Sequence, residues 1–400
     1  MTSLLVIIVL VLLAVALWQL TKIFDLTQVG SSSSSDDSQV ASDNDNNIQG
    51  YLMFGFLAFI YIFTIYGLLK WGNLALHTPA SEHGVLVDSL MNITWVLIFT
   101  VQVITQGLLY WFSFKNRGHK EKKALFFADS NKLEAIWSII PSVVLACLIL
   151  YGLYAWNNIM FVDKDEDVIE IEIYAQQFKW TARYAGKDNV LGKANVRLIE
   201  GINTLGVDMS DPYAQDDIVV TELHLPKGKK VHFKMRSQDV LHSAYFPHFR
   251  AQMNVVPGMV TEFAFIPTYT TAEYRELPFM VEKVSNINKI RAEKSTELLA
   301  KGGTALDPYT FDYLLLCNKI CGASHYNMQM KVVVDTPEDY KKWLSEKTTL
   351  AQDIKAAAAA EKPAEGEAGA TTDSASTIVK DTVKTVVDTV KAAVAKVAMK

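Results

Sequence analysis

The sequence predicts membrane-spanning helices followed by an all-β domain. Half of the 400 residues are hydrophobic, and much of that half lies before residue 157 in four long apolar runs. From residue 168 onward, hydrophobic residues instead recur at every second position, which is typical of strands. The net charge of −5 is mild and excludes bulk nucleic-acid binding as a main role.

Each apolar run is close to the roughly 20 residues that a helix needs to cross a bilayer. The runs cover residues 4–20, 51–69, 91–112 and 135–156. The first run has neither the basic leader nor the small-residue cleavage site of a signal peptide, so we expect an uncleaved span. Cleavage of this run is the alternative, and it would change the predicted side of the N-terminus.

A basic connection between the third and fourth runs predicts the orientation. Its basic residues are Lys115, Arg117, Lys120, Lys122 and Lys123. Basic loops favour the cytoplasmic side, so the β domain lies outside. Four spans then place the N-terminus outside too, with an acidic Ser/Asp-rich linker inside.

We expect the chain to have five segments. They are an extra helix and the acidic linker at 1–50, a second extra helix at 51–89, a helix hairpin at 90–160, the β domain at 161–347, and an Ala-rich tether with an amphipathic helix at 348–400. The valines of the last segment recur every three or four residues, which predicts either a plain surface helix or one that docks on a partner or the membrane face.

The β domain begins with a strand in which Ile169, Ile171 and Ile173 alternate with Glu170 and Glu172, as in a half-buried strand. Residues 231–236 alternate in the same way. Two stretches, 187–217 and 271–308, are expected to be insertions, and the second contains a helix that ends at a glycine pair. A further short helix is expected from residue 337 onward.

The three cysteines differ in what they predict. Cys147 lies within an apolar run, where a buried inert thiol is expected. Cys317 and Cys321 lie in the stretch CNKICGASHYNM with His325 and Met328. A copper electron carrier uses a thiolate, two imidazoles and a weak methionine ligand, so this loop predicts copper.

The second imidazole of that site has to come from elsewhere, and we expect it from His242, placed at the end of the strand that begins at Val231. Because Cys317 and Cys321 are four residues apart, both can bridge, which predicts two copper ions sharing two thiolates. A disulfide or a structural zinc site is the alternative, but neither uses Met328. His224, His232 and His248 are also available, and the first two are expected to be surface residues.

These motifs, together with QDVLHSAYFPHFRAQMNVVPGM and NKLEAIWSIIPS in the helix hairpin, resemble cytochrome c oxidase subunit II over roughly residues 90–347. The resemblance implies a cupredoxin β-barrel, a binuclear copper centre and a helix hairpin beside a haem-copper catalytic subunit in a bacterial inner membrane, with the barrel on the periplasmic side. The implied copper ligands are His242, Cys317, the backbone carbonyl of Lys319, Cys321, His325 and Met328.

Two positions depart from the family pattern. Lys319 stands where the family usually has a magnesium-binding glutamate, so we expect the magnesium site to be altered, because an ammonium cannot ligate magnesium. Phe178 stands where the family has the tryptophan through which electrons arrive, and Trp180 follows two residues later, on what we expect to be the same strand face. Either ring is a candidate for accepting electrons.

The resemblance implies an electron-accepting subunit of a proton-pumping oxidase, with subunit I and other oxidase subunits as partners. No Cys-x-x-Cys-His haem site occurs, so we expect a cytochrome c, or a cytochrome c domain of another chain, as the donor. Residues 208–222 are acidic and are expected either to attract that donor or to form a solvated loop. The alternatives are a copper-free structural subunit and a nitrous oxide reductase.

Glu134 precedes the fourth apolar run at its cytoplasmic end. On sequence alone, the carboxylate is expected to stabilise the first turn of the helix. The resemblance implies a second role, as the mouth of a proton pathway into the catalytic subunit.

Overall fold

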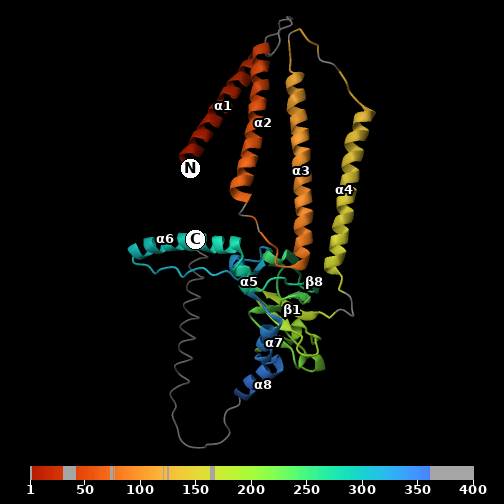
Figure 1. Ribbon diagram of the computed structural model, residues 1–400, viewed down its shortest axis with the longest axis vertical. Coiled ribbons are helices and arrows are strands. Elements are labelled where there is room, and N and C mark those ends of the chain that lie inside the picture. The colour runs from red at the N-terminus through yellow and green to blue at the C-terminus, as the bar shows by residue number, and fades with distance from the viewer. Residues whose placement is uncertain are drawn as a thin grey trace, which may run out of the picture. The chain divides into compact units, whose positions relative to one another are not determined.

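The computed structural model describes residues 2–29, 42–72, 75, 77–119, 121–123, 126–162 and 167–360. Its first four helices are α1 (Thr2–Val29), α2 (Asp43–Trp71), α3 (Glu82–Lys115) and α4 (Asn131–Met160) (Figure 1). Within the described residues, three helices are long and apolar enough to cross a membrane, namely α2, α3 and α4. The apolar stretch found in α1, Ile8–Ile23, is shorter, so a fourth span stays a prediction.

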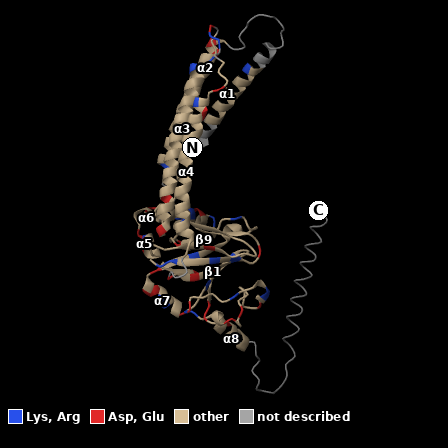
Figure 2. Ribbon diagram, turned by 90° about the vertical axis from the view of Figure 1, so that its right-hand side faces the viewer, with Lys and Arg blue, Asp and Glu red and all other residues tan. Residues whose placement is uncertain are grey.

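The long helices carry their charged residues mainly near their ends (Figure 2). Helices α2 and α3 lie against each other, since the Tyr61 hydroxyl donates to the Val103 carbonyl at 3.2 Å. Cys147 is exposed on the surface of α4 and is not buried as expected, because α4 makes few contacts with the other helices. The linker at 30–41 and the C-terminal valine pattern lie outside the described residues.

The second half of the chain forms two five-stranded sheets. Their strands are β1 (Ile169–Gln176), β2 (Lys179–Tyr184), β3 (Ile218–Val220), β4 (Leu223–Pro226), β5 (Val231–Ser237), β6 (His242–Phe246), β7 (Ala251–Val255), β8 (Thr261–Phe265), β9 (Tyr313–Cys317) and β10 (Gln329–Asp335). The strand orders are β3-β2-β1-β5-β8 and β4-β10-β9-β6-β7. The parallel pairs are β1 with β5 and β4 with β10.

A single hydrophobic core lies between the sheets. Alternate residues of one sheet, such as Ile171 and Phe233, point into it, and Leu225, Leu315 and Val332 meet them from the other. This arrangement is a β-sandwich in which each sheet buries one face against the other. The predicted alternation in β1 and β5 is confirmed on this inner face.

The outer face of the first sheet is not exposed as the alternation predicted. Glu172 is buried between the guanidinium groups of Arg183, at 2.6 Å, and Arg236. Arg183 also donates to buried Asp217 at 2.7 Å. Burial raises the pKa of Asp217 to about 6 against the influence of that guanidinium. The insertion supplies the cover, because the carbonyl of Gly192 accepts a hydrogen bond from Arg183.

The insertions and the C-terminal part contain the remaining helices. The α-helices are α5 (Thr271–Arg275), α6 (Pro278–Ala300), α7 (Pro337–Ser345) and α8 (Leu350–Ala360). The short 3-10 helices are η2 (Val196–Leu198), η3 (Pro212–Ala214), η4 (Pro247–Phe249) and η5 (His325–Asn327). Helix α6 stops just before Gly302 and Gly303, as predicted, and Gly302 has the positive φ of 80° that favours glycine at a helix end.

The segment before α3 is tied to the β domain. Ala80 donates its N–H to the His248 carbonyl at 2.7 Å, and the Ser81 hydroxyl donates to the Phe249 carbonyl at 2.6 Å. Arg250 reaches from the domain to both carboxylate oxygens of Asp88 on α3, at 2.8 and 2.9 Å. These contacts fix the start of α3 to the sheet that carries the candidate site.

Candidate metal centre

Two neighbouring strands and one loop bring the predicted ligands together. His242 is the first residue of β6, not the last residue of the strand that begins at Val231, and Cys317 ends β9. The two strands are antiparallel neighbours, with Ala244 opposite Cys317. The loop between β9 and β10 supplies the other side chains, and Met328 ends it just before β10.

The sulfur and nitrogen atoms of these residues form a continuous chain of short separations. Cys317 Sγ lies 3.7 Å from His242 Nδ1 and 3.9 Å from Cys321 Sγ. Cys321 Sγ in turn lies 3.5 Å from His325 Nδ1 and 3.8 Å from Met328 Sδ. Both cysteines are free thiols. All five predicted side-chain ligands therefore face one space.

The sixth predicted donor is a backbone oxygen. The carbonyl of Lys319 lies 3.2 Å from Cys317 Sγ, while the Lys319 side chain is exposed. Among the described residues, one group of at least three His, Cys, Asp or Glu side chains has its ligand atoms within 4.8 Å of one another, and it is His242, Cys317 and Cys321. This donor set, with two thiols and a thioether, suits a soft metal such as copper.

The loop is closed by backbone contacts and by a glycine. Cys317 donates its N–H to the Met328 carbonyl at 3.1 Å, which joins the two ends of the loop. Gly322 has a φ of 143°, and a Cβ there would lie 2.8 Å from the Phe178 ring. The ring therefore packs directly on the loop, and only a glycine leaves room for it.

A chain of hydrogen bonds outside the ligand set orients two of the ligands. His242 is fully buried, and its Nε2 lies 2.9 Å from Asp239 Oδ1, so Nδ1 is the nitrogen that faces the sulfurs. Asp239 Oδ2 accepts the Gln177 N–H at 2.7 Å, and the Gln177 side chain donates to the Cys321 carbonyl. Asp239 and Gln177 thus connect His242 with Cys321.

Neither Asp239 nor Gln177 was predicted from the sequence. Asp239 lies three residues before His242, and a carboxylate this close to a ligand histidine is the one signal that could have identified it. Gln177 gives no such signal, because its contact with Cys321 is made across the fold. Although burial opposes ionisation of Asp239, the Gln177 N–H and the His242 imidazole hold its pKa below the usual range.

The thiols themselves favour a cation. Burial and then the neighbouring Cys317 thiol raise the pKa of Cys321 to about 11. The thiolate is the metal-binding form. Two neighbouring thiolates therefore repel each other, and a metal cation bound between the surrounding ligand atoms would stabilise them.

The two aromatic candidates occupy different places, which corrects one expectation. Phe178 lies in the two-residue turn between β1 and β2, and Trp180 lies within β2, so they do not share a strand face. The turn removes Phe178 from the pleat alternation. Phe178 is half-buried, whereas Trp180 is 2% exposed and its indole N–H points to the Met328 carbonyl at 3.4 Å.

Several other predicted residues lie away from the centre. Glu134 is exposed in the first turn of α4, whose other end adjoins the β domain. His232 is buried beside Glu170 at 2.7 Å, and His224 stacks on Trp343 at 4.1 Å, so neither is an ordinary surface residue.

The acidic segment at 208–222 serves the fold more than its sequence suggested. Asp217 is buried and paired, so it cannot attract a partner from the surface. Asp216 accepts the N–H groups of Lys187 and Asp188, and Asp211 accepts the N–H of Lys193. These carboxylates shape the turns of the first insertion.

Comparison with known proteins identifies the family. A relative from Bradyrhizobium diazoefficiens, the alternative cytochrome c oxidase subunit 2, is 35% identical over 279 residues, which cover 68% of this chain and 84% of the relative. The chain belongs to the cytochrome c oxidase subunit II family. It is a subunit of cytochrome c oxidase, a respiratory enzyme complex.

Further comparisons agree with this assignment. The family model "Cytochrome C oxidase subunit II, transmembrane domain" matches residues 69–154, which contain α3 and most of α4. Cytochrome c oxidase subunit 2 of Thermostichus vulcanus is 23% identical, over 68% of this chain and 78% of the relative.

Two solved structures resemble parts of the chain. The periplasmic domain of subunit II (CoxB) of Bradyrhizobium japonicum is 18% identical, with a TM-score of 0.27 over 46% of this chain and 95% of that domain. A subunit of a haem-copper terminal oxidase dimer is 14% identical, with a TM-score of 0.28 over 52% of this chain and all of that one.

Proposed function

We propose that this subunit accepts electrons from a cytochrome c at a binuclear copper centre and passes them to the catalytic subunit of the oxidase, in which O2 is reduced to water. The observation that supports this most is the convergence of two thiols, two imidazole Nδ1 atoms and a thioether at successive separations of 3.5 to 3.9 Å. The sandwich that carries them is, in this proposal, a cupredoxin barrel.

Each residue of the site has a definite task in this proposal. Cys317 and Cys321 would hold the two copper ions through their thiolates, His242 and His325 would be further ligands, and Met328 and the Lys319 carbonyl would be weak ligands. When bound, the copper pair supplies a one-electron centre whose charge is shared by both ions. Asp239 and Gln177 keep the ligands in place, so that little has to move when the charge changes.

Zinc is the competing metal for this donor set. Zinc would be satisfied by the two thiolates and two imidazoles in a tetrahedron and would leave Met328 without a role. Met328 is 1% exposed and its sulfur points at Cys321, which favours a soft metal that accepts a thioether.

Copper counting on the purified subunit tests the proposal. We expect two copper ions per chain and the EPR spectrum of an electron shared between two copper nuclei, and we expect Cys317→Ser to abolish that spectrum. Cys147→Ser is the matched control, because it makes the same change on the exposed surface of α4. One copper per chain, zinc in its place, or an unchanged spectrum in the Cys317 variant would reject the proposal.

We further propose that the β domain lies on the periplasmic side of a bacterial inner membrane. Lys115 ends α3, and Arg117, Lys122 and Lys123 follow in the connection to α4, at the end of the helices away from the β domain, which supports a cytoplasmic position for this connection. In that orientation, a cytochrome c outside the membrane reaches the copper loop directly, and subunit I receives the electrons within the complex.

Glu134 then lies on the cytoplasmic side, where protons are supplied. We propose that this exposed carboxylate collects protons for a pathway into the catalytic subunit. Glu134→Ala in the assembled oxidase is expected to slow proton uptake during reduction of the active site while leaving the copper content unchanged. Rapid-mixing measurements between about pH 6 and 8 test this.

Glu121→Ala, in the exposed connection before α4, is the control for that measurement. Normal haem reduction in the Glu134 variant across the whole pH range would show that the carboxylate only stabilises the start of α4.

A further inference from the structure

A second hollow lies away from the metal centre, between α6 and the segment that joins α2 to α3. Its volume is about 440 Å³. The lining residues come from the joining segment, from η4, from α5 and from α6: Ala75, His77, His248, Tyr274, Phe279, Met280, Glu282, Lys283, Asn286, Ile287 and Ile290. None of the residues of the candidate metal centre lines this pocket.

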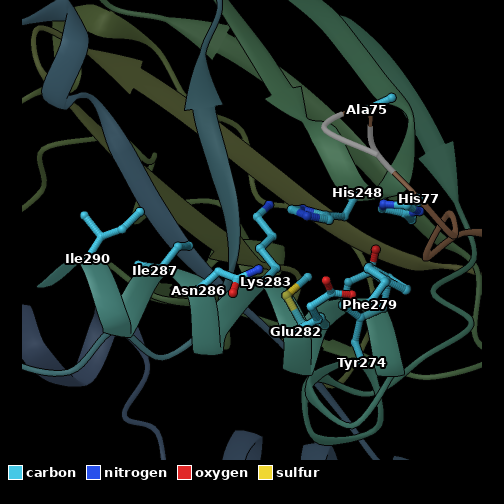
Figure 3. A pocket seen from close by; sticks show the side chains of 11 residues that line it. Ala75, His77, His248, Tyr274, Phe279, Glu282, Lys283, Asn286, Ile287 and Ile290 are labelled. Carbon is cyan, nitrogen blue, oxygen red and sulfur yellow. The ribbon is translucent and has the colours of Figure 1, made fainter. Parts of the chain in front are cut away.

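One wall of the pocket offers polar groups that lack a partner. His248 Nδ1 is buried and has no hydrogen-bond partner among the described residues. Its ring is held between the rings of Tyr274, at 5.5 Å, and Phe311, at 5.0 Å. Lys283 extends from α6 toward this imidazole (Figure 3) and makes no ion pair within the described part of the chain. Burial and then the Lys283 ammonium lower the pKa of His248 to about 4, so the imidazole is neutral.

The charges that line the pocket are mixed. With His248 neutral, Lys283 is a cation of the wall and the adjacent Glu282 is an anion. The next turn of α6 brings the polar Asn286 and then the apolar Ile287 and Ile290 to the pocket, and Ile290 is 54% exposed. A fitting ligand therefore has an apolar part and a head group with one negative and one positive charge.

The pocket also lies close to the membrane surface. In the last turn of α2, which ends at Trp71, Lys70 lies over the rings of Tyr66 and Trp71, at 5.3 and 6.0 Å, as is typical of the boundary between lipid and water. Ala75 follows four residues later, and four extended residues reach at most about 14 Å. The lipid head groups extend about 5 to 8 Å beyond the hydrocarbon.

We propose that this pocket binds the head group of a zwitterionic phospholipid that carries a primary ammonium. Lys283 donates to the phosphate, and so does His248, whose neutral ring carries its hydrogen on Nδ1. Glu282 accepts from the lipid ammonium, and Ile287 and Ile290 contact the start of the acyl chains. The proposal is independent of copper and of the direction of electron transfer.

The test uses the assembled oxidase in detergent, titrated with phosphatidylethanolamine, phosphatidylglycerol or phosphatidylcholine and followed by native mass spectrometry. We expect one phosphatidylethanolamine to be retained per copy of this subunit. Lys283→Gln is expected to weaken this lipid and phosphatidylglycerol alike by about tenfold, because each loses a charged hydrogen bond. Glu282→Gln is expected to weaken phosphatidylethanolamine alone.

Lys289→Gln and Glu293→Gln are the matched controls, because they make the same changes on α6 outside the pocket lining. His248→Phe preserves the aromatic packing and removes Nδ1, so it gives a second reading if Lys283→Gln perturbs folding. Equal lipid retention in the pocket and control variants would overturn the proposal. Competition by inorganic phosphate at the same concentration as the lipid would also overturn it, since the site would then recognise an ion alone.

Discussion

Two buried clusters of ionisable side chains in the same β-sandwich are built in opposite ways. Beneath the first insertion, Glu172 and Asp217 face Arg183 at 2.6 and 2.7 Å, and Arg236 completes the group, so acids and bases cancel. In the loop after β9, two thiols, two imidazoles and a thioether face one another instead. The charges of the first cluster are balanced by residues of this chain, whereas the thiolates of the second would be stabilised by a bound cation.

The comparison shows that burial and a perturbed pKa do not by themselves mark a functional site. The pKa of Asp217 is raised to about 6 and that of Cys321 to about 11, in both cases chiefly by burial. Asp217 has a guanidinium beside it, whereas Cys321 has a second thiol. What distinguishes the two is whether the neighbouring groups supply the opposite charge.

The largest expected effect is on the acid-base cluster of Glu172, Asp217, Arg183 and Arg236. Glu172→Gln leaves the buried guanidinium of Arg183 and the partly buried guanidinium of Arg236 without their shared carboxylate, so we expect the free energy of unfolding to fall by about 3 to 5 kcal/mol. Chemical denaturation of the full chain in detergent, followed by tryptophan fluorescence, measures this. Copper stoichiometry in the fraction that remains folded should not change.

Glu200→Gln, on the exposed part of the same insertion, is the control and should change stability by no more than about 0.5 kcal/mol. A Glu172 variant as stable as this control would mean that the buried charges are not paired in solution, and the contrast between the clusters would fail.

An intermediate effect is expected at the edge of the thiol and imidazole cluster. Asp239→Asn keeps an oxygen near His242 but removes the negative charge that holds the imidazole, so we expect copper affinity to fall by about 10- to 100-fold. Competition with a copper chelator measures the affinity, and the denaturation midpoint of the copper-free protein should stay the same. Asp188→Asn on an exposed turn is the matched control. If the free energy of unfolding of the copper-free protein falls by as much as the free energy of copper binding, Asp239 stabilises the fold and does not act on the metal site.

The smallest expected effect is at the outer side of the thiol and imidazole cluster. Phe178 is half-buried against Gly322, whereas Trp180 lies beneath the loop, so we propose Phe178 as the position through which electrons arrive. Phe178→Leu keeps much of the packing and removes the aromatic ring, and it should slow electron donation from cytochrome c several-fold with copper content intact. Stopped-flow reduction measures the rate. An unchanged rate would leave another surface position as the acceptor.

Much of the architecture could be predicted from the sequence because it depends on periodicity. The helices α2 to α4, the alternation in β1 and β5, and the helix before the glycine pair each follow from a local pattern. The convergence of five side chains at the candidate site could be predicted as well, since four of them lie in one twelve-residue stretch and the resemblance supports His242 as the fifth.

The remaining features depend on contacts that no local pattern contains. Glu172 looks like an outward-facing strand residue, and it is buried because a distant insertion folds over it. Phe178 and Trp180 look like neighbours on one strand, but a two-residue turn separates them. Gln177 reaches Cys321 across 144 residues of sequence, so its role appears only in three dimensions.

Arg250 links the metal loop to the membrane. It follows β6, the strand that begins with His242, and it grips Asp88 on α3 while its own backbone is left-handed, at a φ of 54°. That conformation costs a residue other than glycine roughly 1 to 2 kcal/mol. The two hydrogen bonds to Asp88 hold the β-sandwich in a fixed orientation to α3, because a rotation of the sandwich relative to α3 would break them. If electrons pass from this domain into a neighbouring subunit, as proposed, this contact would keep the distance between donor and acceptor constant from one turnover to the next.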